Sequence, residues 1–298
     1  MRIFVTGATG FIGSRIVPQL LAAGHQVLGL SRSDQGAAWL AAAGAEVHRG
    51  QLKDPESLRA GAEAADAVIH TAFDHDFSRF AAHCEQDDQA IEAMGSALQG
   101  SKRPLVITSG VGMGMAADGV MASETVVNLE HPNPRSASER AANRLLEAGV
   151  NVSAVRLPQV HDTRKQGLIT PYIEVCRQRG VMAYVGEGLN RWSAIHVDDA
   201  ARVYRLAVEH AVAGARWHAV AEKGVTARAI AEVLAARLQL PVKSVPPEAA
   251  AAQFGWMGMF VGMDLPADSA LTRQRLGWTP AGPGLLSDLA GLELGAEA

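Results

Sequence analysis

The chain has 298 residues, of which 48% are hydrophobic and 19% charged, with a formal net charge of −4. This composition is typical of a globular protein with a large core, and the 27 lysines and arginines are too scattered to follow a nucleic-acid backbone or an acidic membrane. Two distant cysteines, Cys84 and Cys176, fit neither a metal nor a redox motif. A strand is predicted at the first residues, and no apolar run reaches the roughly 20 residues of a membrane span. We therefore expect a cytoplasmic protein that binds no metal.

The first half of the sequence alternates between short apolar runs and helical segments. The apolar runs have the length and continuous hydrophobicity of buried parallel strands, and they are Arg2–Thr6, Gln26–Leu30, Ala45–His48, Asp66–His70, Pro104–Thr108 and Val152–Arg156. The segments predicted to be helices are Phe11–Ala23, Gln35–Ala43, a short helix that begins at Pro55, Phe77–Gln99 and Ser136–Ala148. Repeated strand–helix units predict an α/β fold, a Rossmann-type doubly wound parallel sheet with right-handed crossovers.

The pattern loosens after about residue 165 into helices and short strands. We therefore predict a dinucleotide-binding domain over residues 1–165 and a smaller C-terminal substrate-binding lobe over residues 166–298. In open parallel sheets the ligand binds outside the carboxyl ends of the strands, so the smaller lobe would close over that edge. The apolar, glycine-punctuated segment Phe254–Leu265 suits either a buried core turn or a substrate lid or subunit contact.

A glycine-rich turn follows the first predicted strand and begins the first predicted helix. Gly7 allows the tight turn, Gly10 lets the backbone approach a pyrophosphate, and Gly13 lets the helix pack close to the strand. The start of the helix offers unpaired N–H groups and a partial positive charge to the phosphates. The whole turn is therefore expected to bind a dinucleotide, including its other members, Thr9, Phe11 and Ile12.

The end of the second predicted strand indicates which dinucleotide is bound. NAD-binding domains usually place a carboxylate there for the ribose diol, whereas this chain has Ser31 and Arg32. A hydroxyl and a guanidinium suit a 2′-phosphate, which favours NADP(H) as the cofactor. Leu52, after the third predicted strand, is expected to lie beside the adenine. Thr71 and Ala72, after the fourth predicted strand, are also expected to bind the cofactor.

These features resemble the extended short-chain dehydrogenase/reductase family, which includes the NAD-dependent epimerases and dehydratases. The segments that carry the resemblance run through nearly the whole chain and are Thr6–Gly13, Val106–Gly110, Val155–His161, Ser193–Asp199 and Leu276–Pro280. The resemblance places Ser109 at the family's catalytic Ser/Thr position, and it places Pro158 and His161 beside the nicotinamide. It also implies a return of the chain to the first domain around residues 192–220, and a homodimer formed through the helices Phe77–Gln99 and Ser136–Ala148.

The chain departs from this family at the catalytic Tyr-x-x-x-Lys pair. Arg135 aligns with the tyrosine and Glu139 with the lysine, and no tyrosine lies between Met1 and Val155. An arginine does not give up its proton, and a glutamate raises the pKa of a neighbouring acid rather than lowering it. A shift of one residue aligns Ser136 and Arg140 instead, but a serine is a far poorer acid than a phenol. The chain therefore resembles an atypical branch of the family.

The favoured interpretation is an NADP(H)-dependent oxidoreductase that reduces a small carbonyl, imine or activated alkene. Ser109 would hold the substrate oxygen, and Arg135 would anchor an anionic substrate or stabilise developing negative charge. The proton would come from water or from a histidine such as His161. A non-catalytic NADP(H)-binding sensor is the second interpretation, which the lost pair favours. A nucleotide-sugar epimerase-like isomerase is the third, and it is disfavoured because that chemistry also needs the tyrosine.

Overall fold

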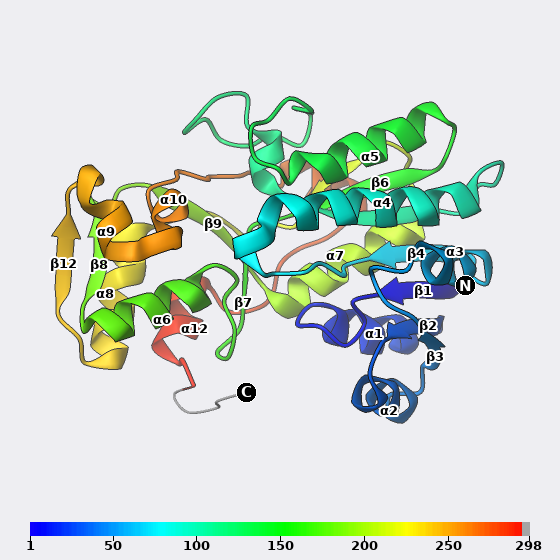
Figure 1. The fold of residues 1–298 in the computed structure, drawn as a ribbon, viewed down its shortest axis with the longest axis horizontal. Helices are drawn as coiled ribbons and strands as arrows, with labels where there is room; N and C mark the ends of the chain where they lie inside the picture. The colour runs from blue at the N-terminus through cyan, green and yellow to red at the C-terminus, as the bar shows by residue number, and fades with distance from the viewer. Residues whose placement is uncertain (294–298) are drawn as a thin grey trace.

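The computed structural model describes residues 1–293, and its centre is a seven-stranded parallel sheet (Figure 1). The strands are β1 (Arg2–Thr6), β2 (Gln26–Ser31), β3 (Glu46–Arg49), β4 (Ala67–His70), β5 (Leu105–Gly110), β6 (Val152–Leu157) and β10 (Arg216–His218). Their order is β3-β2-β1-β4-β5-β6-β10, and every neighbouring pair is parallel. This order reverses at β1, as in a doubly wound sheet, so the predicted Rossmann-type fold is confirmed.

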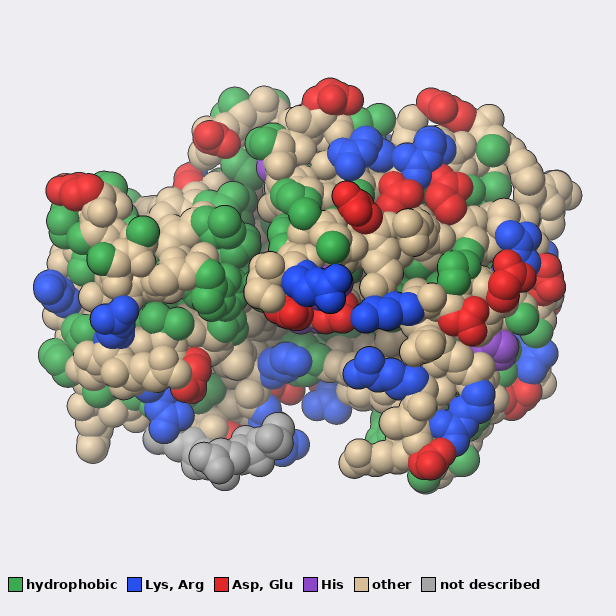
Figure 2. Space-filling model, in the orientation of Figure 1, with side chains coloured by type: hydrophobic (Ala, Val, Ile, Leu, Met, Phe, Trp, Pro, Cys, Tyr) green, Lys and Arg blue, Asp and Glu red, His purple; other side chains and the backbone are tan. Residues whose placement is uncertain are grey.

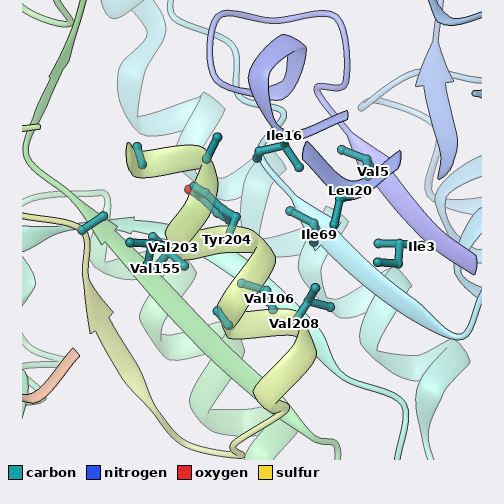
Figure 3. Packing of buried hydrophobic residues seen from close by; sticks show 14 of the residues in the cluster. Ile3, Val5, Ile16, Leu20, Ile69, Val106, Val155, Val203, Tyr204 and Val208 are labelled. Atoms are coloured by element: carbon teal, nitrogen blue, oxygen red, sulfur yellow. The ribbon is translucent and has the colours of Figure 1, made fainter. Parts of the chain in front are cut away.

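Helices cover both faces of this sheet because successive side chains of each strand point to opposite faces. Ile3 and Val5 of β1 belong to the cluster under α1 (Gly13–Ala22), α2 (Asp34–Ala42) and α7 (Val197–His210), which Figure 3 shows around Tyr204. Phe4, between them, belongs to the cluster under α3 (Pro55–Glu63), α4 (Phe80–Leu98) and α5 (Ser136–Glu147). The core of the sheet domain is therefore two apolar layers, one on each face.

A second, smaller lobe has a core of its own, at the left of Figure 1. Its helices are α6 (Ile169–Arg179), α8 (Ala227–Leu238), α9 (Ala250–Phe254), α10 (Gly258–Val261) and α12 (Leu285–Ala290), and its parallel strand pair is β8 (Met182–Val185) with β12 (Val242–Val245). A three-stranded sheet links this lobe to the large domain and contains β7 (Gln159–His161), β9 (Arg191–His196) and β11 (Glu222–Thr226). The remaining helix, α11 (Ala270–Leu276), packs against α7 and β10.

The segment Phe254–Leu265 is in part a buried core turn, as one of its two interpretations expected, and its role as a lid or subunit contact stays a prediction. Phe254, Met257 and Phe260 are buried in the core of the smaller lobe, whereas Trp256 and Met259 are exposed. Within residues 1–293 no helix is long and apolar enough to cross a membrane. In the same residues no group of three or more histidine, cysteine or acidic side chains is arranged to hold a metal ion.

Candidate dinucleotide and substrate site

The carboxyl ends of β1, β4 and β5 meet at the edge of the sheet that faces the smaller lobe (Figure 1). Figure 2 shows a hollow between the two lobes at this edge, with lysine and arginine side chains gathered around it. A crevice outside the carboxyl ends of parallel strands is the usual ligand site of an open α/β sheet. The positive charge around it suits an anionic ligand such as a dinucleotide.

The glycine turn has the shape that a pyrophosphate cradle needs. Gly7 has a φ of +65°, which favours glycine, and a Cβ on Gly13 would lie 2.0 Å from the carbonyl oxygen of Gly7. The backbone N–H groups of Phe11 and Ile12 have no hydrogen-bond partner among the described residues. These groups lie at the start of α1, where the helix dipole favours an anion, so the turn fits the phosphates of a dinucleotide.

The end of β4 holds the glycine turn in place. The Thr71 hydroxyl donates to the carbonyl oxygen of Thr6 at 2.8 Å, and the Ala72 N–H donates to the Thr6 hydroxyl at 3.3 Å. A Cβ on Gly7 would lie 2.7 Å from the Ala72 nitrogen, so these two segments touch. Thr71 and Ala72 therefore lie against the glycine turn, next to the expected place of the phosphates.

The residues predicted to select the dinucleotide lie at the ends of β2 and β3. Ser31 is buried, and its hydroxyl donates to the carbonyl oxygen of Ser33 at 3.0 Å. Arg32 is exposed and forms no ion pair among the described residues. Arg49, which the sequence reasoning missed, is the register partner of Ser31 on β3 and pairs with Asp34 at the start of α2. Two guanidinium groups thus flank the end of β2.

Leu52 lines a hollow of about 230 Å³ beside this edge. The hollow lies between the loop that precedes α3 and the outer face of α4, where Glu85, Gln86 and Gln89 face it. An apolar side chain together with amide and carboxylate groups suits a flat heterocycle with polar edges. The place of Leu52 near the adenine stays a prediction.

At the end of β5, Arg135 occupies the place that the alignment gives to the catalytic tyrosine. Its Nη2 donates to the carbonyl oxygen of Thr108 at 3.0 Å, and its Nη1 donates to Asp87 at 2.7 Å. The guanidinium also lies 4.1 Å from the centre of the Phe73 ring. The neighbouring Ser109 is buried, and its hydroxyl has no hydrogen-bond partner among the described residues. The structure therefore brings Ser109 and Arg135 together at one strand end.

Asp87, on α4, organises this end of the sheet and was not found from the sequence. Besides Arg135, it accepts hydrogen bonds from Ser138 at 2.6 Å and from His70 at 3.0 Å, and the other ring nitrogen of His70 contacts the Thr6 hydroxyl at 2.6 Å. Burial raises the pKa of this carboxyl, but the Arg135 charge and these hydrogen bonds outweigh it and lower the pKa to about 2. Asp87 is therefore a carboxylate at neutral pH, and it balances the charge of Arg135.

The structure does not bring Glu139 to the crevice, contrary to the expectation from the alignment. Its carboxylate is buried and accepts from Arg156 Nε at 2.8 Å and from Arg216 Nε at 2.6 Å. Burial opposes its ionisation, but the two guanidinium groups outweigh this effect and lower its pKa. Glu139 ties α5 to β6 and β10 in a buried ion-pair network, and we assign it no part in the reaction.

His161, expected to lie beside the nicotinamide and to supply a proton, has no exposed surface. Its side chain is fully buried, and its Nδ1 lies 2.7 Å from a carboxylate oxygen of Asp288 on α12, with the His196 ring packed edge-on. Burial lowers its pKa, although Asp288 acts in the opposite sense. Pro158, by contrast, is partly exposed between β6 and β7. His161 therefore joins the lobes, and it is not placed to supply a proton to a substrate in the crevice.

None of the chain's three tyrosines stands in for the missing phenol. Tyr172 donates to the carbonyl oxygen of Ala183 inside the smaller lobe, and Tyr184 lies under the Arg228 guanidinium. Tyr204 is fully buried on α7 and shares a hydrogen bond of 2.7 Å with the Thr108 hydroxyl, and burial raises its pKa well above the ordinary value. The alignment shifted by one residue puts Ser136 and Arg140 in the places of the tyrosine and the lysine. Arg140 donates a hydrogen bond to the Ser136 hydroxyl, so these two side chains bind each other.

An aromatic wall links the end of β4 to the smaller lobe. Phe73 packs edge-on against His75, and Phe77 stacks on Trp256 with 5.0 Å between ring centres. Burial, followed by the positive charges of Lys165 and Arg135, lowers the pKa of His75. His75 is therefore a neutral imidazole near the crevice, and the wall offers apolar surface to a substrate.

Comparisons with known proteins identify the family of this chain. The family model described as the NAD dependent epimerase/dehydratase family matches residues 3–220. The chain belongs to this family, and its resemblance to extended short-chain dehydrogenases/reductases is confirmed. The family uses a nicotinamide dinucleotide as its cofactor.

Relatives and solved structures extend over most of the chain. An uncharacterised protein of Schizosaccharomyces pombe is 44% identical over 97% of this chain and 98% of its own length. A 2-alkyl-3-oxoalkanoate reductase of Stenotrophomonas maltophilia is 30% identical over 72% of this chain and 67% of its own. The structure of a dTDP-glucose 4,6-dehydratase from Streptomyces venezuelae, with NAD bound, has a TM-score of 0.76 at 22% identity, covering 97% of this chain and 95% of that one. At this identity the last similarity concerns the fold alone.

Proposed function

We propose that this protein is an NADP(H)-dependent reductase of a small carbonyl, imine or activated alkene that works without a tyrosine–lysine pair. The observation that carries the proposal is the buried, unpartnered hydroxyl of Ser109, next in the chain to Thr108, whose carbonyl oxygen accepts a hydrogen bond from Arg135. A buried polar group without a hydrogen bond costs about 1–3 kcal/mol, and a bound substrate oxygen would remove that cost. The reductase from Stenotrophomonas maltophilia supports a carbonyl as the group reduced.

In this proposal the protein binds and polarises the substrate, and a bound nicotinamide supplies the hydride. Ser109 donates a hydrogen bond to the substrate oxygen or nitrogen. Arg135 is held by Asp87 and the Thr108 carbonyl, and it uses its remaining N–H groups to stabilise the negative charge that develops there. Asp87 balances the charge of Arg135. Arg135 therefore acts mainly as a hydrogen-bond donor held in a fixed position, and it attracts anions less strongly. The proton comes from water, because the lowered pKa of His75 leaves that imidazole neutral.

Turnover by variants tests these roles. Loss of one well-placed donor lowers turnover by about 10²–10³-fold, so Arg135→Gln should do so while leaving NADPH affinity nearly unchanged, and Ser109→Ala should act in the same direction. Arg144→Gln is the matched control, because Arg144 also pairs with a carboxylate of α4, Asp88, but on the surface. Equal turnover in the control and in Arg135→Gln would show that Arg135 takes no part in the reaction.

The preference for NADP(H) over NAD(H) rests on Arg32 and Arg49, which flank Ser31 where NAD-binding domains place a carboxylate. Asp34 already pairs with Arg49, so we assign the larger part to Arg32. Titration of both cofactors should show tighter binding of NADPH. Arg32→Gln should weaken NADPH by about 10-fold or more, since a charge-assisted bond contributes about 1.5–3 kcal/mol, and leave NADH unchanged. Equal starting affinities for the two cofactors would contradict this part of the proposal.

A non-catalytic NADP(H)-binding sensor is the second candidate, favoured by the absence of a free phenol near Arg135. Stopped-flow oxidation of bound NADPH against a panel of small ketones, imines and enones separates the two functions. Oxidation with any of these substrates supports the reductase. If bound NADPH stays reduced against the whole panel while binding tightly, the sensor is the better description.

A further inference from the structure

The loop that leads into the smaller lobe lies over the start of α1. Lys165, in this loop, has its Nζ 5.8 Å from the centre of the Phe11 ring, and Phe11 lies in the glycine turn between Gly10 and Gly13. Lys165 is exposed and forms no ion pair among residues 1–293. A free ammonium group therefore faces the turn whose N–H groups are arranged for phosphates.

The fold holds this loop against α1. The Asp162 carboxylate accepts the backbone N–H groups of Arg164 and Lys165, each at 2.8 Å, which fixes a tight turn. The same carboxylate lies 3.5 Å from the Arg15 guanidinium in the first turn of α1. Asp162 thus connects α1, the helix that follows the glycine turn, to the loop that carries Lys165.

Neighbouring cations are balanced, whereas Lys165 is not. Arg15 lies near Asp162 and Asp198, Arg135 pairs with Asp87, and Arg164 lies 3.3 Å from Glu293. The positive charge of Lys165 also contributes, after burial, to the lowered pKa of His75 beyond the end of β4. The ammonium group therefore acts on the inside of the crevice, and an anion bound there would be the partner that this charge lacks.

We propose that Lys165 binds the pyrophosphate of the dinucleotide from the side of the smaller lobe, so that both lobes hold the cofactor. The proposal rests on cofactor binding at the glycine turn and does not depend on turnover. Lys165 would close over the phosphates opposite the Phe11 and Ile12 N–H groups. Asp162 would be a positioning residue, because it fixes the turn that presents the lysine. Since NAD(H) and NADP(H) share the pyrophosphate, Lys165 would contribute equally to both, unlike Arg32.

Titration calorimetry with NADH, NADPH and ADP-ribose tests this role. Lys165→Gln should raise the Kd of all three ligands by a common factor of about 10, which corresponds to about 1.4 kcal/mol, and it should reduce the dependence of Kd on salt. Lys165→Arg should retain most of the affinity. Arg164→Gln is the matched control, because it removes the adjacent exposed cation that Glu293 already balances, and it should change none of the three.

The outcomes separate this proposal from its competitors. Unchanged Kd values for all three ligands in Lys165→Gln would overturn it. A loss confined to NADPH would assign Lys165 to the 2′-phosphate instead. Unchanged cofactor binding with a raised KM for a substrate would show that the lysine meets an anionic group of that substrate. Failure of the reductase assay would leave these binding results intact, so the two proposals stand or fall separately.

Discussion

Among the charged residues of α4, Asp87 is expected to cause the largest loss of stability when it is replaced. Its carboxylate is fully buried and has three side-chain partners, Arg135, His70 and Ser138. The lowering of its pKa from 3.8 to about 2 corresponds to on the order of 2.5 kcal/mol at neutral pH, at about 1.4 kcal/mol for each pH unit. Asp87→Asn should therefore lower the free energy of unfolding by about 2–4 kcal/mol, because it also leaves Arg135 without its balancing charge.

Asp88 provides the matched control. It is the next residue of the same helix and also pairs with an arginine, Arg144, but this pair is exposed to solvent. Exposed ion pairs contribute about 0–1 kcal/mol, so Asp88→Asn should change stability little. Urea denaturation at neutral pH measures both variants. Equal losses for Asp87→Asn and Asp88→Asn would refute the reasoning from burial.

The dependence of stability on pH in the acid range gives a second test of the same carboxylate. A carboxyl group whose pKa is lowered by folding contributes its full stability above the unfolded value, and that contribution is lost as the pH falls through the folded value. For Asp87 this loss should occur between about pH 4 and pH 2, and it should be absent in Asp87→Asn. A double-mutant cycle with Arg135→Gln then isolates the pair, since the second substitution should cost less when Asp87 has already been replaced.

Three further predictions concern the turn, a buried histidine and a buried tyrosine. Gly13→Ala should abolish NADPH binding, because its Cβ would lie 2.0 Å from the Gly7 carbonyl oxygen and displace the backbone; undiminished binding would place the phosphates elsewhere. Burial and the Arg156 charge lower the pKa of His218 from 6.5 to about 4, so stability should fall as the pH drops through this range, and His218→Gln should flatten that slope in pH-dependent melting curves. Tyr204→Phe should cost about 1 kcal/mol through its lost bond to Thr108 and leave the pH profile of turnover unchanged; an altered profile would identify a phenol acid.

The sequence by itself determined the class of fold and the position of the glycine turn. Continuous apolar runs identify buried parallel strands because both of their faces are covered, and Gly7 and Gly13 of the turn occupy positions where a Cβ would collide. The turn itself is a local pattern, which a single stretch of sequence expresses. The chain positions of Ser109 and Arg135 could likewise be predicted, because a strand end and the following helix start are fixed by their neighbours.

Only the tertiary structure decided what those side chains contact. Glu139 aligns with a catalytic lysine, yet it pairs with Arg216 of β10, a strand of three residues whose Arg-Trp-His sequence carries no apolar run to predict it. Asp87 lies on a helix face that packing against α5 and the end of β4 buries. Lys165 reaches the glycine turn from a segment more than 150 residues away. The role of a charged side chain depends on the residue that it contacts. These contacting residues are distant in sequence, so no local pattern could identify them.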